Sequence, residues 1–433
     1  MKELNKPLYQ LLYEEIKSEI LKSVYKKGSK LESVRSLAKK RNISTTTVEK
    51  AYNQLLIEGY VKSEPRSGYF VLDVITPDRS SFNNLVEPII YKTYSNNKLT
   101  TDLFDIKGYK RIVNKVMNYD YEKLYTECDP RGEIELRKEI RKFILEERNV
   151  KCDVNQIIIG TGIQNLLNIL LDFTNKSSVT YLSPEFKKAM EVFRTFNYLL
   201  LPKNDIEEIT NTKTDFLYIS PSNTYPLGDI IKVKDRNDLI KWARSNKTYI
   251  IEDDYNFFIR YNSYTIPSIH SYDNGENVIY MGSFAKMLIP SIRISFMVLP
   301  ISLYNLYKDT FRKNSQGVSK LDQLSLALFM KEGLFKRHTK KLYAQYKEKN
   351  ESIKKCLLKY SSHNSFTIQG SDSNLHLVLD FNTLKSLNQF TRNCENLSFE
   401  YQKIENKRSL IFPYSGIEIS DMNEIIKKLL YQV

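Results

Sequence analysis

Apolar residues recur at helical spacing near the start of the chain, where three helices are predicted. Between residues 8 and 20, leucine and isoleucine return every three or four positions, the pattern of an amphipathic helix. Gly28 interrupts this pattern, and residues 33–41 then predict a shorter helix. A third helix follows Ser44, a residue type that suits the N-cap position. Its apolar face would hold Val48, Ala51, Tyr52 and Leu55.

After the third helix, a β-hairpin is predicted. Residues 60–62 and 69–71 alternate like two strands, and residues 64–68 between them contain proline and glycine. Helix, turn, helix and hairpin in this order is the layout of a winged helix-turn-helix. In that fold the second helix of the pair enters the major groove of DNA. Residues 1–71 are therefore predicted to bind DNA, and residues 72–99 to form an extended linker.

The predicted DNA contacts come from two helices and the hairpin. Small polar side chains at the start of the third helix suit phosphates and base edges, and basic side chains suit the phosphate backbone. The residues predicted to contact DNA are Arg35, Ser44, Thr45, Thr46, Lys50, Arg66 and Gly68.

Charge and composition support an anionic partner. The 433 residues are 41% hydrophobic and 27% charged, which excludes a disordered chain and fits a soluble protein of two or three domains. The formal net charge is +14, and residues 1–71 alone carry a surplus of six positive charges. The positive charge is thus much denser in the predicted DNA-binding domain.

Four segments of the first domain follow a known family pattern: Leu-Glu-Ser-Val-Arg-Ser-Leu-Ala at 31–38, Ser-Thr-Thr-Thr-Val at 44–48, Ala-Tyr at 51–52 and Ser-Gly-Tyr-Phe-Val at 67–71. On these segments the domain resembles the GntR family of bacterial regulators. Two positions depart from the family pattern: Glu32 replaces a proline, and Thr45 replaces an arginine. Both changes lie near the expected DNA face, so they bear on affinity and on the operator sequence.

From about residue 100, helical patterns alternate with short, continuously apolar runs. This alternation predicts an α/β fold with a mostly parallel sheet and helices on both faces. Ligands of such sheets bind at the carboxyl ends of the strands. The predicted strands are 156–159, 179–182, 216–219, 249–251, 277–281 and 294–298.

Three of these strands lead to residues that could bind a ligand or take part in a reaction. The strand 156–159 ends in Gly-Thr-Gly and opens a helix, 249–251 ends in Glu-Asp-Asp-Tyr, and 277–281 leads to Lys286, with Arg293 seven residues further on. Singly, these features are explained by turn geometry, solvated carboxylates and a surface lysine. Together they supply what pyridoxal 5'-phosphate (PLP) requires: a lysine amine, an aspartate for the ring nitrogen, a phosphate cup and a cation.

This part of the chain resembles the fold type I aminotransferases, and more closely the effector domain of the MocR (GabR-like) subfamily of GntR regulators. The motifs lie at 129–132, 160–164, 221–228, 251–255 and 282–293. The resemblance implies a large PLP-binding domain over 100–300, a small C-terminal α/β subdomain over 301–433, and a homodimer.

The resemblance also implies residue roles. Lys286 would bond to the cofactor aldehyde, Asp253 would pair with the pyridine nitrogen, and Tyr255 would touch the ring hydroxyl. Phe186 would stack on the ring. The phosphate would be held by Gly162, Ile163, Gln164, Ser283 and Arg293.

One departure bears on function. Aminotransferases commonly carry a carboxylate-clamping arginine in the C-terminal strand, where this chain has Ile411; Arg408 lies three residues earlier. Losing a bidentate clamp removes a contact of about 1.5–3 kcal/mol, which argues against efficient transamination. We therefore expect a PLP-dependent transcriptional regulator that binds operator DNA and senses an amine, an amino compound or a B6 vitamer through Lys286. An active aminotransferase carrying a DNA-binding module, and a DNA-binding protein on an inert scaffold, remain alternatives.

Metal and membrane partners are not expected. The four cysteines contain no Cys-x-x-Cys, and the four histidines show no ligand spacing. The longest apolar stretch, residues 280–300, is broken by Lys286 and Arg293, and the N-terminus has no apolar signal core. A reducing cytoplasm is the expected compartment.

Overall fold

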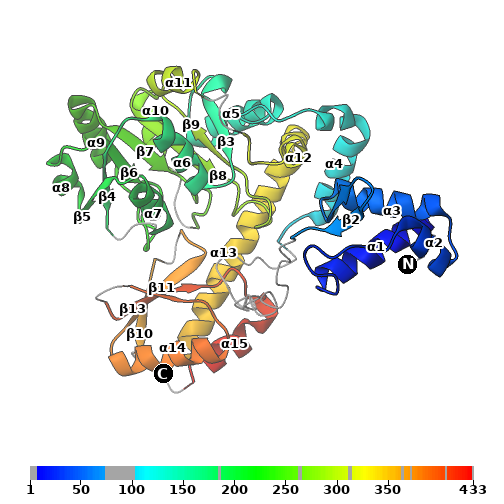
Figure 1. Cartoon of the computed structure of the whole chain (residues 1–433). Coiled ribbons are helices and arrows are strands. Elements are labelled where there is room, and N and C mark those ends of the chain that lie inside the picture. Colours follow the sequence, from blue (N-terminus) through cyan, green and yellow to red (C-terminus); the bar gives the residue numbers. More distant parts are fainter. Residues whose placement is uncertain are drawn as a thin grey trace. The chain divides into compact units, whose positions relative to one another are not determined.

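The computed structural model describes residues 7–73, 103–183, 187–261, 266–310, 315–361, 365–370, 373–404 and 407–431. Internal contacts divide the chain into two units, residues 1–90 and 91–433. Figure 1 colours the first unit blue and the second from cyan to red.

The first unit is a winged helix-turn-helix. The hairpin pairs its strands antiparallel, with Glu64 opposite Gly68 next to the turn. Its elements are α1 (Leu8–Leu21), α2 (Val34–Arg41), α3 (Thr45–Ile57), β1 (Val61–Glu64) and β2 (Gly68–Val71).

Local signals in the sequence determine where α2 and α3 begin. The Ser33 hydroxyl accepts from the backbone N–H of Ser36, and the Ser44 hydroxyl accepts from that of Thr47, so each serine caps a helix. Asn42 ends α2 in the left-handed conformation, which asparagine tolerates. The predicted apolar face of α3 is confirmed, because Val48, Ala51, Tyr52 and Leu55 are all buried.

The second unit is built on a seven-stranded sheet in the order β3-β9-β8-β7-β6-β4-β5. β9 runs antiparallel to β3 and to β8, and the remaining neighbours are parallel. The prediction of a mostly parallel sheet is thus confirmed. The strands are β3 (Ile157–Gly160), β4 (Ser178–Leu182), β5 (Leu199–Lys203), β6 (Phe216–Ile219), β7 (Tyr249–Asp253), β8 (Val278–Ser283) and β9 (Ser295–Val298).

Helices cover both faces of this sheet (Figure 1). Side chains alternate between the faces along each strand, so that Ile158 packs in one apolar core while Ile157 and Ile159 pack in another. The helices are α4 (Ile106–Tyr119), α5 (Ile134–Arg148), α6 (Ile163–Phe173), α7 (Lys187–Thr195), α8 (Ile206–Thr210), α9 (Val233–Asn246), α10 (Ile269–Asp273), α11 (Ile301–Tyr307) and α12 (Lys320–Lys331), with 3-10 turns at Tyr121–Tyr125 and Val154–Gln156.

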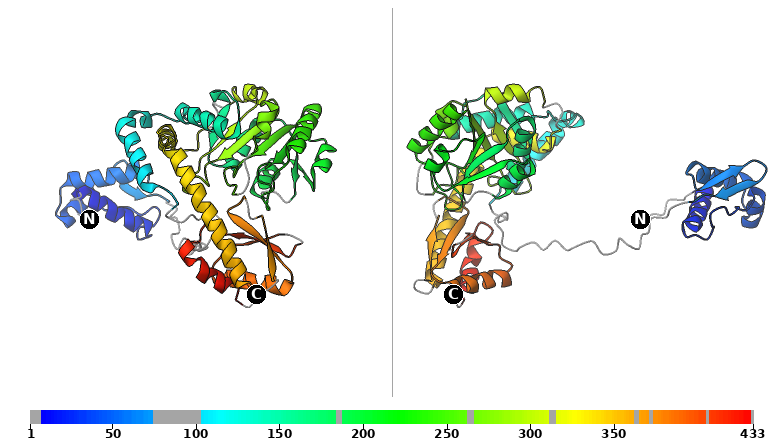
Figure 2. Two further views of the ribbon diagram at one scale, coloured as in Figure 1. Left: turned by 180° about the vertical axis from the view of Figure 1, so that it is seen from behind. Right: turned by 60° about the vertical axis from the view of Figure 1, so that its left-hand side comes forward.

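A second, four-stranded antiparallel sheet follows in the order β10-β11-β13-β12. The 27-residue helix α13 (Leu334–Tyr360) links the two sheets (Figure 2). Phe335 at its start belongs to the core of the large sheet, and Leu357 near its end belongs to the core of the small one. The remaining elements are β10 (Phe366–Gln369), β11 (His376–Phe381), α14 (Leu384–Asn396), β12 (Gln402–Lys403), β13 (Ser409–Pro413), a 3-10 turn (Ile419–Asp421) and α15 (Met422–Leu429).

No helix among the described residues is long and apolar enough to cross a membrane. No group of three or more histidine, cysteine or acidic side chains there could hold a metal ion.

Candidate functional site

The sheet brings the strand-end motifs to one edge. β7 and β8 are parallel neighbours with Asp253 opposite Met281, so Asp253 and the segment that leads to Lys286 leave the sheet on the same side. β3 is antiparallel to β9, which is antiparallel to β8, so β3 and β8 point the same way. The turn after β3 and the residues before β9 therefore meet at this edge as well.

Lys286 lies three residues beyond the end of β8. Its backbone carbonyl accepts a hydrogen bond of 3.1 Å from the Tyr346 hydroxyl of α13. Burial lowers the pKa of the Lys286 amine to about 8, and the negative charge of Glu400 works in the opposite direction. A substantial fraction of this amine is thus uncharged near neutral pH, as a nucleophile requires.

Asp253 is the last residue of β7 and is buried. One of its carboxylate oxygens, Oδ2, accepts a short hydrogen bond from the hydroxyl of Tyr218 on the neighbouring strand β6. The other, Oδ1, is buried and has no hydrogen-bond partner among the described residues. Burial raises the pKa of Asp253 to about 7, while the Tyr218 bond acts to lower it. Oδ1 is therefore an acceptor open to a donor from outside the chain.

The two acidic residues beside Asp253 are already engaged. Asp254 accepts from Arg148 Nε at 2.6 Å and from the Tyr280 hydroxyl at 2.8 Å. Glu252 accepts from the first two backbone N–H groups of α10, at 2.8 and 2.9 Å. Asp254 Oδ1 also has no hydrogen-bond partner among the described residues, but the charge of Asp254 is paired with Arg148. Asp253 therefore has both an open oxygen and no ion pair among the described residues, which makes it the candidate to bind a ligand.

Arg293 lies beside the turn after β3, where the sequence predicts an anion site. Gly162 has φ +124°, and a Cβ atom built on it would lie 3.2 Å from Arg293 Nη2. Arg293 Nε also lies 3.4 Å from the Thr161 carbonyl oxygen. The guanidinium and the N-terminus of α6 therefore face the same small space, and both favour an anion. At the end of β8, the Ser283 hydroxyl accepts from the Ser295 hydroxyl at 3.0 Å.

Of the four remaining residues predicted to bind the cofactor, the structure describes three. Ile163 and Gln164 begin α6, and the Gln164 amide donates to the Lys188 carbonyl at 3.3 Å. Tyr255 lies in the turn just after Asp253 and is half-buried. Phe186, predicted to stack on the cofactor ring, lies outside the described residues.

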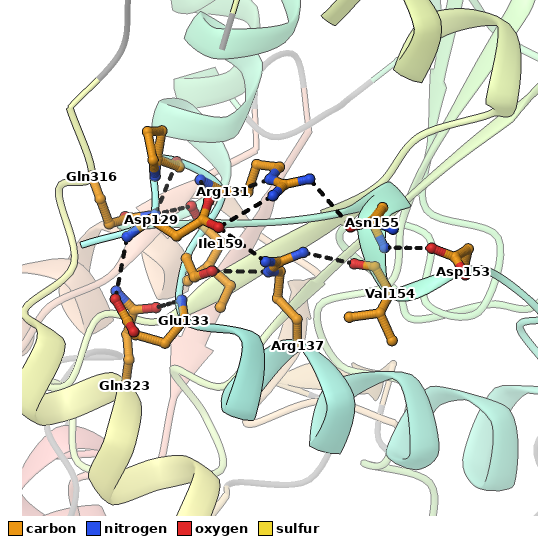
Figure 3. A network of polar contacts seen from close by, with 12 residues as sticks. Asp129, Arg131, Glu133, Arg137, Asp153, Val154, Asn155, Ile159, Gln316 and Gln323 are labelled. Atoms are coloured by element: carbon orange, nitrogen blue, oxygen red, sulfur yellow. Dashed lines mark hydrogen bonds and ion pairs between the residues drawn. The ribbon is translucent and has the colours of Figure 1, made fainter. Parts of the chain in front are cut away.

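A polar network holds the motif 129–132 against β3 (Figure 3). Arg137 donates to the Gly132 carbonyl at 2.8 Å, and Gln316 donates to the Ile159 carbonyl at 3.1 Å. Gly132 has φ +96°, and a Cβ there would lie 2.5 Å from the Ile159 side chain. The network thus fixes the strand that leads to the predicted anion site.

A cleft of about 930 Å³ lies between the large and small sheets of the second unit. Ser183 and Ser220, which follow β4 and β6, line one wall, and Asp380 and Ser409 of the small sheet line the other. Arg408 also lines the cleft and is exposed. Arg408 directly precedes β13, and its carbonyl still accepts a hydrogen bond of 2.9 Å from the backbone N–H of Phe381 at the end of β11.

Sequence reasoning missed several residues around Lys286 and Asp253. Tyr218 was read only as part of an apolar strand, although a tyrosine hydroxyl in a buried strand needs a partner. His376 is buried and lies beside the Pro226 carbonyl at 2.8 Å; burial lowers its pKa to about 4, so it is neutral and donates from Nε2. Arg148 and Glu400 are far away in sequence from the groups they act on, and no local pattern identifies them.

The residues predicted to contact DNA are exposed on the first unit, except Gly68, which is half-buried. Thr45 and Thr46 are exposed at the start of α3, and Arg35 is exposed on α2. Lys50 is exposed on α3, with its ammonium 5.9 Å from the centre of the Tyr9 ring. Arg66 is exposed in the hairpin turn.

Ion pairing separates the basic residues of this unit into two groups. Lys17, Lys27, Lys40 and Arg41 are each paired with a carboxylate at 2.5–2.7 Å. By contrast, Arg35, Lys50 and Arg66 have no ion pair with any residue that the structure describes. The second group can therefore meet DNA phosphates without first breaking an ion pair with a described residue.

Comparison with known proteins agrees with this architecture. Residues 8–71 match the gntR family of bacterial regulatory proteins, and residues 123–432 match aminotransferase class I and II. The fold and site thus define a DNA-binding head joined to an aminotransferase-like domain. The chain belongs to the MocR-type group of GntR transcriptional regulators, in which these two parts are fused.

Two relatives match nearly the whole chain. The uncharacterized HTH-type transcriptional regulator YdeL of Bacillus subtilis is 33% identical, covering 98% of this chain and 96% of its own length. The probable rhizopine catabolism regulatory protein MocR of Rhizobium meliloti is 26% identical, covering 98% and 93%. Among solved structures, the α-aminoadipate aminotransferase LysN of Thermus thermophilus matches 78% of this chain and 90% of its own, with a TM-score of 0.68 and 19% identity, which shows the shared fold.

Proposed function

We propose that this regulator binds PLP through Lys286 and that a small amine, an amino compound or a B6 vitamer changes its binding to operator DNA. The observation that carries the proposal is the meeting, at one sheet edge, of a lysine amine, a carboxylate oxygen without a partner and a guanidinium beside a helix N-terminus. The GntR head provides the DNA-binding part.

The residues fit the chemistry of PLP. When bound, PLP supplies an aldehyde that reacts with amines and a protonated ring that withdraws electrons. Asp253 Oδ1 would accept from the ring nitrogen and keep it protonated. Arg293 and the backbone N–H groups after Gly162 would neutralise the phosphate. The Lys286 amine, with a pKa of about 8, would supply the nucleophile.

A cleft between the two sheets of the second unit supports a small-molecule effector. Its volume of about 930 Å³ is that of a site for a small ligand, although Lys286, Asp253 and Arg293 are not among the residues that line it. An effector held between the two sheets would bind one arrangement of the subdomains better than another. Such a difference in affinity is what an effector needs in order to shift DNA binding. We also infer a homodimer, the state implied by the family resemblance.

The test has two stages and uses the full chain. Visible absorbance during PLP titration should show a lysine-bound cofactor in wild type and in Lys241→Ala, whose side chain is 80% exposed, but not in Lys286→Ala. DNA fragments selected from a random pool should then bind wild type with an affinity that changes when PLP and an amine are added. If wild type stays colourless, the cofactor proposal is wrong. If it is coloured but turns over amino acids with 2-oxoglutarate rapidly, the active aminotransferase becomes the better description.

A further inference from the structure

We propose that Tyr218 is a positioning residue, which holds the Asp253 carboxylate ionised and oriented so that Oδ1 faces the ring nitrogen of the cofactor. The proposal rests on the proposed function, because it concerns a residue that acts on PLP through Asp253. Tyr218 itself would touch neither the cofactor nor the effector.

The geometry begins with the register of the sheet. β6 and β7 are parallel neighbours with Tyr218 opposite Ile251, and Asp253 lies two residues beyond Ile251. Residues two apart in a strand share a face, so the tyrosine and the carboxylate point to the same side of the sheet. The Tyr218 hydroxyl donates to Oδ2 of Asp253, and both side chains are buried.

The ionised state of the Asp253 carboxylate depends on this hydrogen bond. Tyr218 Oη is the hydrogen-bond donor that the structure gives Asp253, and Oδ1 has no partner among the described residues. Burial and the nearby charge of Asp254 both oppose ionisation of Asp253, while the Tyr218 bond favours it. Without Tyr218, a carboxylate with no donor in the protein would hold a proton more readily. The proton would then sit on Asp253 Oδ1 rather than on the ring nitrogen, and the ring would lose its positive charge.

Packing fixes the tyrosine ring independently of its hydroxyl. The ring is fully buried and lies edge-on to Phe193, with the ring centres 6.2 Å apart at an angle of 77°. Tyr218→Phe therefore removes the donor and leaves the apolar contacts in place. The matched control is Tyr198→Phe, which removes another buried hydroxyl from the same apolar core. Tyr198 precedes β5, and β4 and β6 separate β5 from β7, so its hydroxyl does not reach Asp253.

The experiment compares these variants with PLP labelled with ¹⁵N in the ring. In wild type and in Tyr198→Phe, the ¹⁵N chemical shift should be that of a protonated pyridine. In Tyr218→Phe it should move toward the value of neutral pyridine, and the Kd for PLP should rise by about 10-fold, as expected for losing a hydrogen bond to a charged group.

A double-mutant cycle separates this role from a general loss of structure. In an Asp253→Asn background, adding Tyr218→Phe should change neither the ¹⁵N shift nor the Kd further, because the carboxylate is already gone. If Tyr218→Phe matches wild type in ¹⁵N shift and Kd, or has the same effect with and without Asp253, the positioning role is overturned. If wild type itself does not bind PLP, it is the proposed function that fails.

Discussion

Arg148 at the end of α5 and Asp254 after β7 form a buried ion pair, with 2.6 Å between Nε and Oδ2 and side chains that are 1% and 0% exposed. The same guanidinium donates to the Ser222 hydroxyl at 2.7 Å in the segment after β6. Arg148 thus joins three segments around Asp253. Since Asp254 follows Asp253 directly, the pair also fixes the backbone that carries the candidate ring partner.

Arg148→Met should destabilise the protein strongly. It leaves the buried Asp254 carboxylate without its cation, a change that costs about 3–5 kcal/mol. The measurement is the free energy of unfolding in urea, with Lys428→Met as the control. Lys428 pairs with Glu424 on the surface, where such pairs contribute about 0–1 kcal/mol. An equal, small effect of the two substitutions would contradict the structural role of Arg148.

Much of this architecture could be predicted from the sequence because its signals are local. Ser44 identified the start of α3, and the apolar runs before Gly160 and Glu252 identified two strands whose ends carry the site. The residue pattern alone does not reveal which of the three carboxylates at 252–254 binds a ligand, because that depends on partners from distant segments; only the family resemblance pointed to Asp253.

Two further features could not be predicted from the sequence, each for a physical reason. Arg148 lies 106 residues before Asp254, and no spacing rule joins a helix end to a strand end at that separation. The strand β5 (Leu199–Lys203) contains a proline and lies at the edge of the sheet, so its pattern is weak.

The rate at which apoprotein captures PLP should depend on pH through Lys286. Burial lowers the pKa of this amine to about 8, from an ordinary value of 10.5. Below pH 8 the uncharged fraction rises about tenfold per pH unit, and above pH 8 it levels off. Stopped-flow absorbance between pH 6 and 10 should follow this curve.

Glu400→Gln should shift the midpoint of the same pH curve in a known direction. The Glu400 carboxylate raises the pKa of Lys286, so its removal should move the midpoint to lower pH. A midpoint near 10.5 in wild type would show that the amine is not held in the buried environment described.

Arg35→Ala should weaken DNA binding across sequences and reduce the slope of log K against log salt by about 1. Arg35 is exposed and has no ion pair among the described residues, so it is available to a phosphate. Lys40→Ala is the matched control, because Lys40 on the same helix is paired with Glu32 at 2.6 Å. Fluorescence anisotropy at several salt concentrations gives both slopes. Equal slopes for wild type and Arg35→Ala would assign Arg35 to another role.

Arg408 should distinguish effectors that carry a carboxylate from simple amines. It is exposed and lines the cleft, whereas Ile411 is buried within β13. Its guanidinium can therefore meet a carboxylate in the cleft, although from outside the strand position where aminotransferases carry their clamp. Losing such a contact costs about 1.5 kcal/mol at the lower end of the range for charged hydrogen bonds, which is roughly tenfold in affinity.

Spectral titration of the PLP-loaded protein measures this difference. Arg408→Ala should weaken binding of amino acids roughly tenfold and leave alkylamines unchanged. Arg392→Ala is the control, because Arg392 is exposed on α14 and does not line the cleft. If both ligand classes bind Arg408→Ala as they bind wild type, the cleft has no carboxylate contact at this position. The effector would then be recognised without a carboxylate contact from Arg408.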